Sequence, residues 1–377
     1  MAKDLFPSPH PLTPPHEVKD RLSWLRLLRS RRVGATTFHR LISEHGTAAE
    51  ALLALPEVAK AAGVKDYAIC PEGVVQAELN AGRLTGARLI CYGEADYPDM
   101  LAQLPDAPPI LWVLGNVDLL ARPMVALVGA RNASSLGTRM ARKLAEGLGA
   151  TDFVVTSGLA RGIDTAAHLA ALKTGTVAVM AGGVDVVYPA ENAVLAQEIG
   201  ESGLRISEQP LGMQPIARHF PQRNRIISGM AQAVVVVEAA ARSGSLITAK
   251  NALDQGRDVL AVPGHPFDAR AAGCNMLIRD GATLVRGVDD VVETLAARTP
   301  PAPPETVTQA AKPVRSLKDT AKLHSEILAR LGPSPVAEDQ LIRDLNISAG
   351  MIAPELLNLE LDGKINRQPG GLLSLAS

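Results

Sequence analysis

The chain has 377 residues, 47% of them hydrophobic, so it is long enough to bury sizeable cores in two or three domains. Its formal net charge is −1, which excludes a global attraction to nucleic acid or to an anionic membrane, so a polyanion site would have to be a local patch. The three cysteines lack CxxC spacing and no run of 18 apolar residues occurs, which argues against a disulfide framework, a zinc site and a membrane span, and favours the cytoplasm.

The N-terminal part divides into two segments. Residues 1–19 contain several prolines and no apolar core of signal-peptide length, which predicts a disordered lead-in. Residues 20–84 have apolar positions at helical spacing, with a turn at residues 33–35, and indicate a small helical module of the SAM or helix-hairpin-helix type. A glycine turn is common in any helical bundle, so DNA contact and a simple packing role both stay open for this module.

Residues 85–297 alternate Val-rich runs with helical patterns. Strands that are apolar on both faces belong to parallel sheets covered by helices on both sides. We therefore predict an α/β domain with a doubly wound, mostly parallel, Rossmann-like sheet. Its expected strands are MVALVGAR, FVVTS, TVAVM, LRISE, AVVVVE, DVLAVPG and TLVRG.

The C-terminal part begins with a Pro/Ala-rich segment at residues 298–316, which has no periodicity and predicts a linker. Residues 317–377 then read as three helices and a β-hairpin with a Pro-Gly-Gly turn, the pattern of a winged helix. The expected recognition helix, Ser348 to Asp362, carries Glu355 and Glu360 and no basic residue. Contact with a protein is therefore at least as well supported for this domain as contact with DNA.

Three predicted strands end in glycine-rich segments, at residues 128–137, 156–164 and 181–189. In a doubly wound sheet the ligand lies beyond the carboxyl ends of the strands, where free backbone N–H groups and helix dipoles favour phosphate. A glycine after a parallel strand is also an ordinary turn requirement, but two of these loops supply an arginine, which favours an anion site. The residues assigned to that site from the loops are Gly129, Arg131, Ser157, Gly158, Arg161 and Gly162.

The segment HFPQRNRIISG, residues 219–229, should begin the crossover helix between the strands LRISE and AVVVVE. Its N-terminal end would then lie at the same edge of the sheet as the glycine loops. A protein that binds single-stranded nucleic acid needs arginines that follow the phosphate backbone and an aromatic ring on which a base can stack. The alternative is that Arg223 or Arg225 holds loops through carbonyl groups or carboxylates, and for Arg225 we favour this structural role. The segment adds Arg218, Phe220, Arg223 and Asn224 to the predicted DNA-binding residues.

Catalysis and cofactor binding find little support in the motifs. There is no G-x-G-x-x-G of the dinucleotide type, no GxxxxGK[ST], no HExxH and no G-x-S-x-G, so we expect no cofactor, no metal and no catalytic residue. Ser243 or Ser245 should cap the helix that follows them, which is more probable for these serines than ligand contact. Asp164 is expected to cap or orient its own loop.

The series VGAR…SSLG, TSGLARGIDTAAH, GGVDVVYPAEN, SEQP, HFPQRNRIISG, VVVVEAAARSGSLITA and DVLAVPG closely resembles the DNA-processing protein A family, DprA or Smf. The resemblance implies an extended Rossmann-like domain that binds single-stranded DNA, forms a homodimer, protects incoming DNA and loads RecA in natural transformation, without enzymatic turnover. By position, the family's DNA contacts fall on Arg131, Ser157, Gly158 and Phe220. Two positions depart from the family pattern: Ala130 replaces the serine of a GSR motif, and a lysine of some members falls on Ala217, so that Arg218 would substitute for it.

A different class of function stays open beside this one. Lysine-decarboxylase-like phosphoribohydrolases use a similar sheet with a PGGxGTxxE signature, and RSGSLITAKNA lies in a comparable place without the PGG or the glutamate. A nucleotide-sensing subunit on the same fold is a third interpretation. Release of free base from nucleoside monophosphates would favour the enzyme, and tight mononucleotide binding without DNA binding would favour the sensor.

Overall fold

The computed structural model describes residues 14–15, 17–298 and most of 317–375, with gaps at 333–334, 346, 348–351, 353–354, 357, 361 and 369–371. The chain forms two compact units, residues 1–299 and 300–377. Most of the expected lead-in at 1–19 and nearly all of the expected linker at 298–316 lie outside the described residues.

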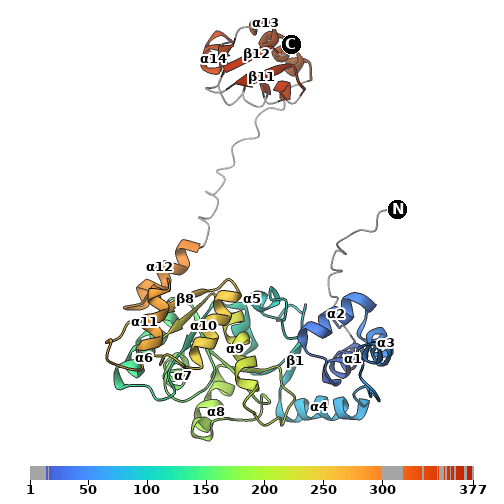
Figure 1. The fold of residues 1–377 in the computed structure, drawn as a ribbon, viewed down its shortest axis with the longest axis vertical. Coiled ribbons are helices and arrows are strands. Elements are labelled where there is room, and N and C mark those ends of the chain that lie inside the picture. The colour runs from blue at the N-terminus through green and yellow to red at the C-terminus, as the bar shows by residue number, and fades with distance from the viewer. Residues whose placement is uncertain are drawn as a thin grey trace. The chain divides into compact units, whose positions relative to one another are not determined.

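Four helices come first among the described elements of the first unit. They form the helical module that the apolar spacing predicts (Figure 1). Trp24 and Phe38 meet edge to face in their core, with ring centroids 5.0 Å apart. This core also includes Leu89 and Trp112, so the helices pack on the first two strands of the sheet and belong to the same compact unit. The helices are α1 (Val18–Arg29), α2 (Ala35–His45), α3 (Ala48–Ala61) and α4 (Glu72–Thr85).

A nine-stranded sheet with the order β1-β2-β6-β5-β4-β3-β7-β8-β9 forms the centre of this unit. The seven strands predicted from the Val-rich runs, β3 to β9, are parallel to their neighbours in that group. Two further strands, β1 and β2, were absent from the prediction and extend one edge in antiparallel register. The strands are β1 (Arg88–Cys91), β2 (Ile110–Gly115), β3 (Met124–Val128), β4 (Val154–Ser157), β5 (Thr176–Val179), β6 (Leu204–Ser207), β7 (Ala233–Val236), β8 (Asp258–Ala261) and β9 (Thr283–Leu284).

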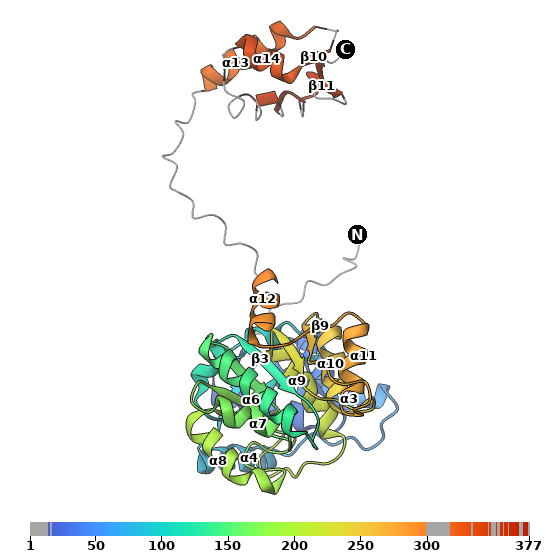
Figure 2. The same cartoon turned by 90° about the vertical axis from the view of Figure 1, so that its left-hand side faces the viewer.

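Helices cover both faces of the sheet, which confirms the doubly wound prediction (Figure 2). One apolar cluster joins α6, α7 and α12 to one face, while a second joins α5, α9, α10 and α11 to the other. Helix α8 packs through its own cluster beside β5. These helices are α5 (Asp99–Ala102), α6 (Ser135–Ala150), α7 (Ile163–Ala171), α8 (Ala193–Ser202), α9 (His219–Met230), α10 (Ser245–Asp254), α11 (Ala272–Arg279) and α12 (Val288–Arg298), with 3₁₀ turns η1 (Val117–Ala121) and η2 (Ala190–Asn192).

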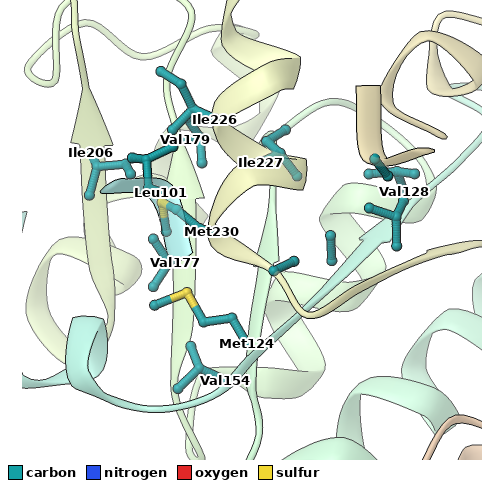
Figure 3. Packing of buried hydrophobic residues seen from close by; sticks show 14 of the residues in the cluster. Leu101, Met124, Val128, Val154, Val177, Val179, Ile206, Ile226, Ile227 and Met230 are labelled. Atoms are coloured by element: carbon teal, nitrogen blue, oxygen red, sulfur yellow. The ribbon is translucent and has the colours of Figure 1, made fainter. Parts of the chain in front are cut away.

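Helix α9 is the crossover that the sequence predicts. The chain moves outward from β3 through β4 and β5 to β6, and α9 then returns it to β7 on the other side of β3. Ile226, Ile227 and Met230 anchor the helix on the sheet (Figure 3). Because these three residues occupy its C-terminal half, the N-terminal half, with Phe220 and Arg223, extends to the carboxyl edge of the strands.

The second unit is a small domain with its own core, in which Ile327, Leu341, Leu356 and Leu373 are fully or almost fully buried. The predicted hairpin is present, with Ile365 opposite Leu375, while its Pro-Gly-Gly turn and much of the expected recognition helix lie outside the described residues. The elements are α13 (Leu317–Arg330), β10 (Val336–Ala337), α14 (Glu338–Leu345), β11 (Ile365–Gln368) and β12 (Leu372–Leu375), and the strand order is β10-β12-β11.

Candidate single-strand binding site

Two adjoining cavities lie at the carboxyl edge of the sheet. The first, of about 360 Å³, is lined by residues from the ends of β3 and β4, by residues 188–189 and by α9, and we call it the aromatic cavity. The second, of about 790 Å³, lies between the ends of β3 and β7, and we call it the switch-point cavity. Arg131, Phe220 and Arg223 line both. The structure therefore brings together the glycine loops and the start of α9, which are far apart in sequence.

The wall shared by the two cavities is a stack of cation and ring. The guanidinium carbon of Arg131 lies over the ring of Phe220, 5.5 Å from its centroid. The Phe220 ring also contacts the ring of Tyr188, with the two ring centroids 5.5 Å apart and the ring planes at 59° to each other. Tyr188 is 51% exposed, so the pair presents aromatic surface to solvent next to a cation. Such a surface can receive a base while the cation meets a phosphate.

A buried hydrogen-bond network holds the loop after β4. The Asp164 carboxylate accepts from the backbone N–H groups of Gly158 and Ala160, which confirms that it orients its own loop. The amide of Asn192 donates to the carbonyl oxygen of Leu159. Burial raises the pKa of Asp164, and the nearby Arg223 cation opposes that rise. The loop is therefore fixed before any ligand arrives, which lowers the entropy cost of binding.

His168 completes this support beneath the loop. Its Nε2 accepts from the Leu159 N–H, and its Nδ1 lies 2.7 Å from the Thr176 hydroxyl, which donates to the Val155 carbonyl. Burial lowers the pKa of His168 to about 3, and the Arg223 cation adds to the effect. The imidazole is therefore neutral, with its proton on Nδ1, because Nε2 must be free to accept.

Arg223 lies at the floor between the two cavities rather than on their rim. It is 6% exposed, and its Nη1 donates to the Val179 carbonyl oxygen at 2.7 Å. Its Nε has no hydrogen-bond partner among the described residues. Burial lowers the pKa of Arg223 to about 10, against the opposing effect of Asp164. The sequence left two roles open for Arg223, a hydrogen bond to a backbone carbonyl and contact with DNA. The hydrogen bond is present, and the side chain also lines both cavities.

The predicted loop glycines are required by close packing. A Cβ on Gly158 would collide with the guanidinium of Arg223, and one on Gly129 would lie 2.6 Å from a side-chain carbon of Ile163. Gly162 has a φ of 77°, and a Cβ there would meet the carbonyl of Ala130. Of these three glycines, Gly158 lines the aromatic cavity and Gly129 the switch-point cavity.

The remaining predicted residues fall into different surroundings. Ser157 is fully buried and donates to the carbonyl oxygen of Leu127, so its hydroxyl does not reach either cavity. Arg161 lines the aromatic cavity and is paired with Glu191 at 2.7 Å, an exposed ion pair that a phosphate can replace at small cost. Arg218 is exposed at the N-cap of α9 and lies outside the lining of both cavities, whereas Asn224 lines the switch-point cavity.

Arg225 has the structural role that the sequence favours. Its guanidinium pairs with Glu208 at 2.5 Å and donates to the Asp106 carbonyl oxygen at 2.7 Å. Both Arg225 and Glu208 keep 17% of their side-chain surface exposed, so the pair is largely shielded from water. The other carboxylate that follows a nearby strand, Glu238, instead accepts from the backbone N–H of Ser134 and fixes the start of α6.

Sequence reasoning missed several lining residues and one cap. Tyr188 lines the aromatic cavity and lies in the third glycine-rich segment, residues 181–189. An aromatic residue in such a segment, in a chain with only four tyrosines, is the signal that could have identified it as a lining residue. The expectation that Ser243 or Ser245 caps α10 is wrong: Gly244 is the N-cap, without a side-chain cap, and the two hydroxyls bond each other at 2.7 Å. Arg242 and Arg270 also line the switch-point cavity.

Among the described residues, no group of three or more His, Cys, Asp and Glu side chains could hold a metal ion. Among the helices described, none combines the length and the apolar character that a membrane crossing needs.

Comparison with known proteins covers almost the whole chain. Residues 88–296 match the family described as DNA recombination-mediator protein A. Residues 18–81 match a DprA-like N-terminal HHH domain, and residues 297–371 match a DprA winged helix domain.

Individual relatives agree with this match. A DNA processing protein DprA from Streptococcus pneumoniae is 48% identical over 198 residues, which are 52% of this chain and 70% of that protein. Protein Smf from Escherichia coli is 38% identical over 282 residues, covering 74% of this chain and 75% of that protein.

Two solved structures resemble the fold. The X-ray structure of DNA processing protein A from Streptococcus pneumoniae matches with a TM-score of 0.61 and 37% identity, over 72% of this chain and 97% of that one. DNA processing protein A from Helicobacter pylori, described with a unique single-stranded DNA binding mode, matches with a TM-score of 0.51 and 27% identity, over 56% of this chain and 96% of that one.

Proposed function

The chain belongs to the DNA recombination-mediator protein A family, and from that membership we propose that its central domain binds single-stranded DNA at the aromatic cavity. The observation that carries the proposal is the stack of Arg131, Phe220 and Tyr188 at the carboxyl edge of a doubly wound sheet. The Helicobacter pylori relative, with its single-stranded DNA binding mode, supports the same ligand.

Phosphate groups are the first requirement of such a ligand. Arg131 makes no hydrogen bond or ion pair with any residue that the structure describes, so its charge is available. Arg161 adds a second cation at the other wall of the aromatic cavity, once it exchanges Glu191 for phosphate. Arg218 supplies a third at the start of α9, where it would substitute for the lysine of some family members.

Bases are the second requirement. A ring such as that of Phe220 stacks on any base, because every base has a π-face, so little sequence preference should follow. The bases of a duplex are already stacked and paired, and they could reach Phe220 only after unpairing. Single-stranded DNA should therefore bind in preference to a duplex of the same sequence.

The wider role follows from the family rather than from the geometry. We propose that the protein is a cytoplasmic homodimer that protects incoming single strands and loads RecA onto them during natural transformation. A recombination mediator needs no turnover, and we propose that this one catalyses none. The phosphoribohydrolase and nucleotide-sensor alternatives are not favoured, because the matched family is one of recombination mediators.

The test is a salt-titrated measurement of binding by fluorescence anisotropy, with labelled oligothymidylate, oligodeoxyadenylate and a duplex. We expect the two single strands to bind similarly and more tightly than the duplex. The logarithm of affinity should fall linearly with the logarithm of salt concentration, by about 0.7 for each phosphate neutralised.

Arg131→Ala should weaken binding to both single strands alike and flatten this slope by about 0.7. The matched control is Arg139→Ala, which removes an exposed arginine of α6 that lines neither cavity. Equal binding of single strands and duplex, or an Arg131→Ala slope equal to that of the control, would refute the proposed site.

A further inference from the structure

We infer that the switch-point cavity is a second phosphate-binding site, formed by Arg242, Gly244 and Ser245 at the start of α10 and by the guanidinium of Arg223. The inference deepens the proposed function, because one source of the phosphate is the DNA strand held in the aromatic cavity. The other source is a free nucleotide, which presents the same chemistry.

The position of the cavity is the first argument. In open α/β sheets ligands bind where the strand order reverses, beyond the carboxyl ends of the strands. Here the reversal lies between β3, which continues to β4, and β7, which follows the return through α9. Val128 and Gly129 at the end of β3 and Ala240 after β7 line the switch-point cavity, whereas the aromatic cavity lies to one side, over β4.

The charge of the lining is the second argument. Four arginines line the cavity, Arg131, Arg223, Arg242 and Arg270, against one carboxylate, Asp164. That carboxylate already accepts two backbone N–H groups and is buried. Arg270 is paired with Asp268, but Arg242 is exposed and makes no hydrogen bond or ion pair with any residue in the described ranges. The cavity therefore carries a surplus of positive charge.

The start of α10 supplies neutral donors to the same space. Its N-cap has no side-chain cap, and Ser245 N–H has only a 3.4 Å contact with the Ser243 hydroxyl. A Cβ placed on Gly244 would meet nothing within 4 Å, so the backbone there is open to a ligand. Helix N-termini with free N–H groups favour phosphate. By contrast, the start of α6 is already occupied by Glu238.

Arg223 provides an independent observation that points to a ligand. A buried cation needs compensation, and Arg223 receives part of it from the nearby Asp164 carboxylate and part from the Val179 carbonyl oxygen, to which its Nη1 donates. The side chain is 6% exposed, its Nε lacks a hydrogen-bond partner among the described residues, and it lines this cavity. A phosphate between α10 and Arg223 would add to this compensation.

The test uses two substitutions in the full chain, each with a matched control. Gly244 has helical dihedral angles, φ −61° and ψ −24°, so Gly244→Asp should fold and place a carboxylate in the proposed phosphate position. Its control is Gly34→Asp at the N-cap of α2, where a Cβ also meets nothing within 4 Å and which lines neither cavity. Arg242→Ala removes the free cation by an independent route, with Arg139→Ala as its control. Binding is measured with oligothymidylate by anisotropy and with thymidine monophosphate by calorimetry, and melting temperatures verify folding.

If the phosphate is that of DNA, Gly244→Asp and Arg242→Ala should weaken oligothymidylate binding by about tenfold, the loss of one charge-assisted contact, and flatten the salt slope by about 0.7. Gly34→Asp and Arg139→Ala should stay close to the wild type. If the source is a free nucleotide, the same two variants should lose thymidine monophosphate and keep oligothymidylate.

The inference is overturned if Gly244→Asp and Arg242→Ala match their controls, Gly34→Asp and Arg139→Ala, with both ligands. A wild type that fails to bind oligothymidylate would instead refute the proposed function. The monophosphate titration would then still decide whether the switch-point cavity takes phosphate.

Discussion

The guanidinium of Arg131 lies over the ring of Phe220, 5.5 Å from its centroid, although 89 positions separate the two residues along the chain. Arg131 follows β3, and Phe220 is the second residue of α9, which returns from the far side of the sheet. The contact exists because the end of β3 and the start of α9 meet at one edge. It joins a cation for phosphate to a surface for a base, and it is the basis of the first prediction.

Removing the ring should reduce affinity for single strands without unfolding the protein. Phe220→Ala is expected to cost about 1–3 kcal/mol of binding, the contribution of one stacked base. Phe220→Trp, which keeps an aromatic face, should retain most of the affinity. Anisotropy titrations with oligothymidylate at constant salt measure both. Wild-type affinity in the alanine variant would remove Phe220 from the site.

Two arginines on the same helix should behave in opposite ways. Arg225→Ala leaves the largely buried Glu208 without its partner and should lower the free energy of unfolding by about 3–5 kcal/mol. Arg218→Ala removes an exposed cation at the N-cap and should leave unfolding nearly unchanged while it weakens DNA binding. Urea unfolding and anisotropy, measured on both variants, check this division. A stability loss in Arg218→Ala, or none in Arg225→Ala, would contradict it.

The packing of the loop against Arg223 should tolerate no side chain at residue 158. Gly158→Ala places a methyl group on the guanidinium of Arg223, and overpacking of this kind costs about 1–3 kcal/mol. Gly287→Ala is the matched control, because a Cβ there meets nothing within 4 Å. The melting temperature should fall for the first variant and not for the second. Equal melting temperatures would show that the loop can move away.

The neutral His168 predicts a specific pH dependence of stability. Its folded pKa, about 3, lies below its ordinary value of 6.5, so between these values the unfolded chain binds a proton that the folded chain excludes. Stability from this group is thus fully present above pH 6.5 and is lost by about 1.4 kcal/mol per pH unit as the pH falls towards 3.

His168→Gln removes that titration, so its free energy of unfolding should fall less steeply over the same range. Urea unfolding from pH 7 to pH 4 measures both slopes, and contributions from other groups cancel in their difference. Parallel slopes would mean that His168 titrates normally in the folded protein.

Single-strand binding should survive the loss of residues 300–377. All the predicted contact residues belong to the compact unit of residues 1–299. We therefore expect the shortened chain to bind oligothymidylate within about threefold of the full chain, less than the effect of one phosphate contact. The same salt titration measures it. A large loss of affinity or of salt slope would assign DNA contacts to the C-terminal domain.

The sequence by itself determined the parallel sheet, the order of its seven Val-rich strands along the chain and the place of α9 as a crossover. These follow from local signals: strands with two buried faces are continuously apolar, and glycine follows them where the backbone must turn tightly. The two antiparallel strands β1 and β2 could not be predicted in the same way. They lie among the short elements of residues 88–115, which do not show the alternation of apolar strands and long helices that marks the parallel strands.

Only the tertiary structure decided what each arginine does. Arg131, Arg223 and Arg225 are equivalent as charges in the sequence, but one stacks on a ring, one lies at a buried floor and one pairs with Glu208. Burial and pairing depend on groups that are distant along the chain, such as the Val179 carbonyl opposite Arg223. The same reason explains Tyr188, whose role exists only because the loop after β5 brings it against Phe220.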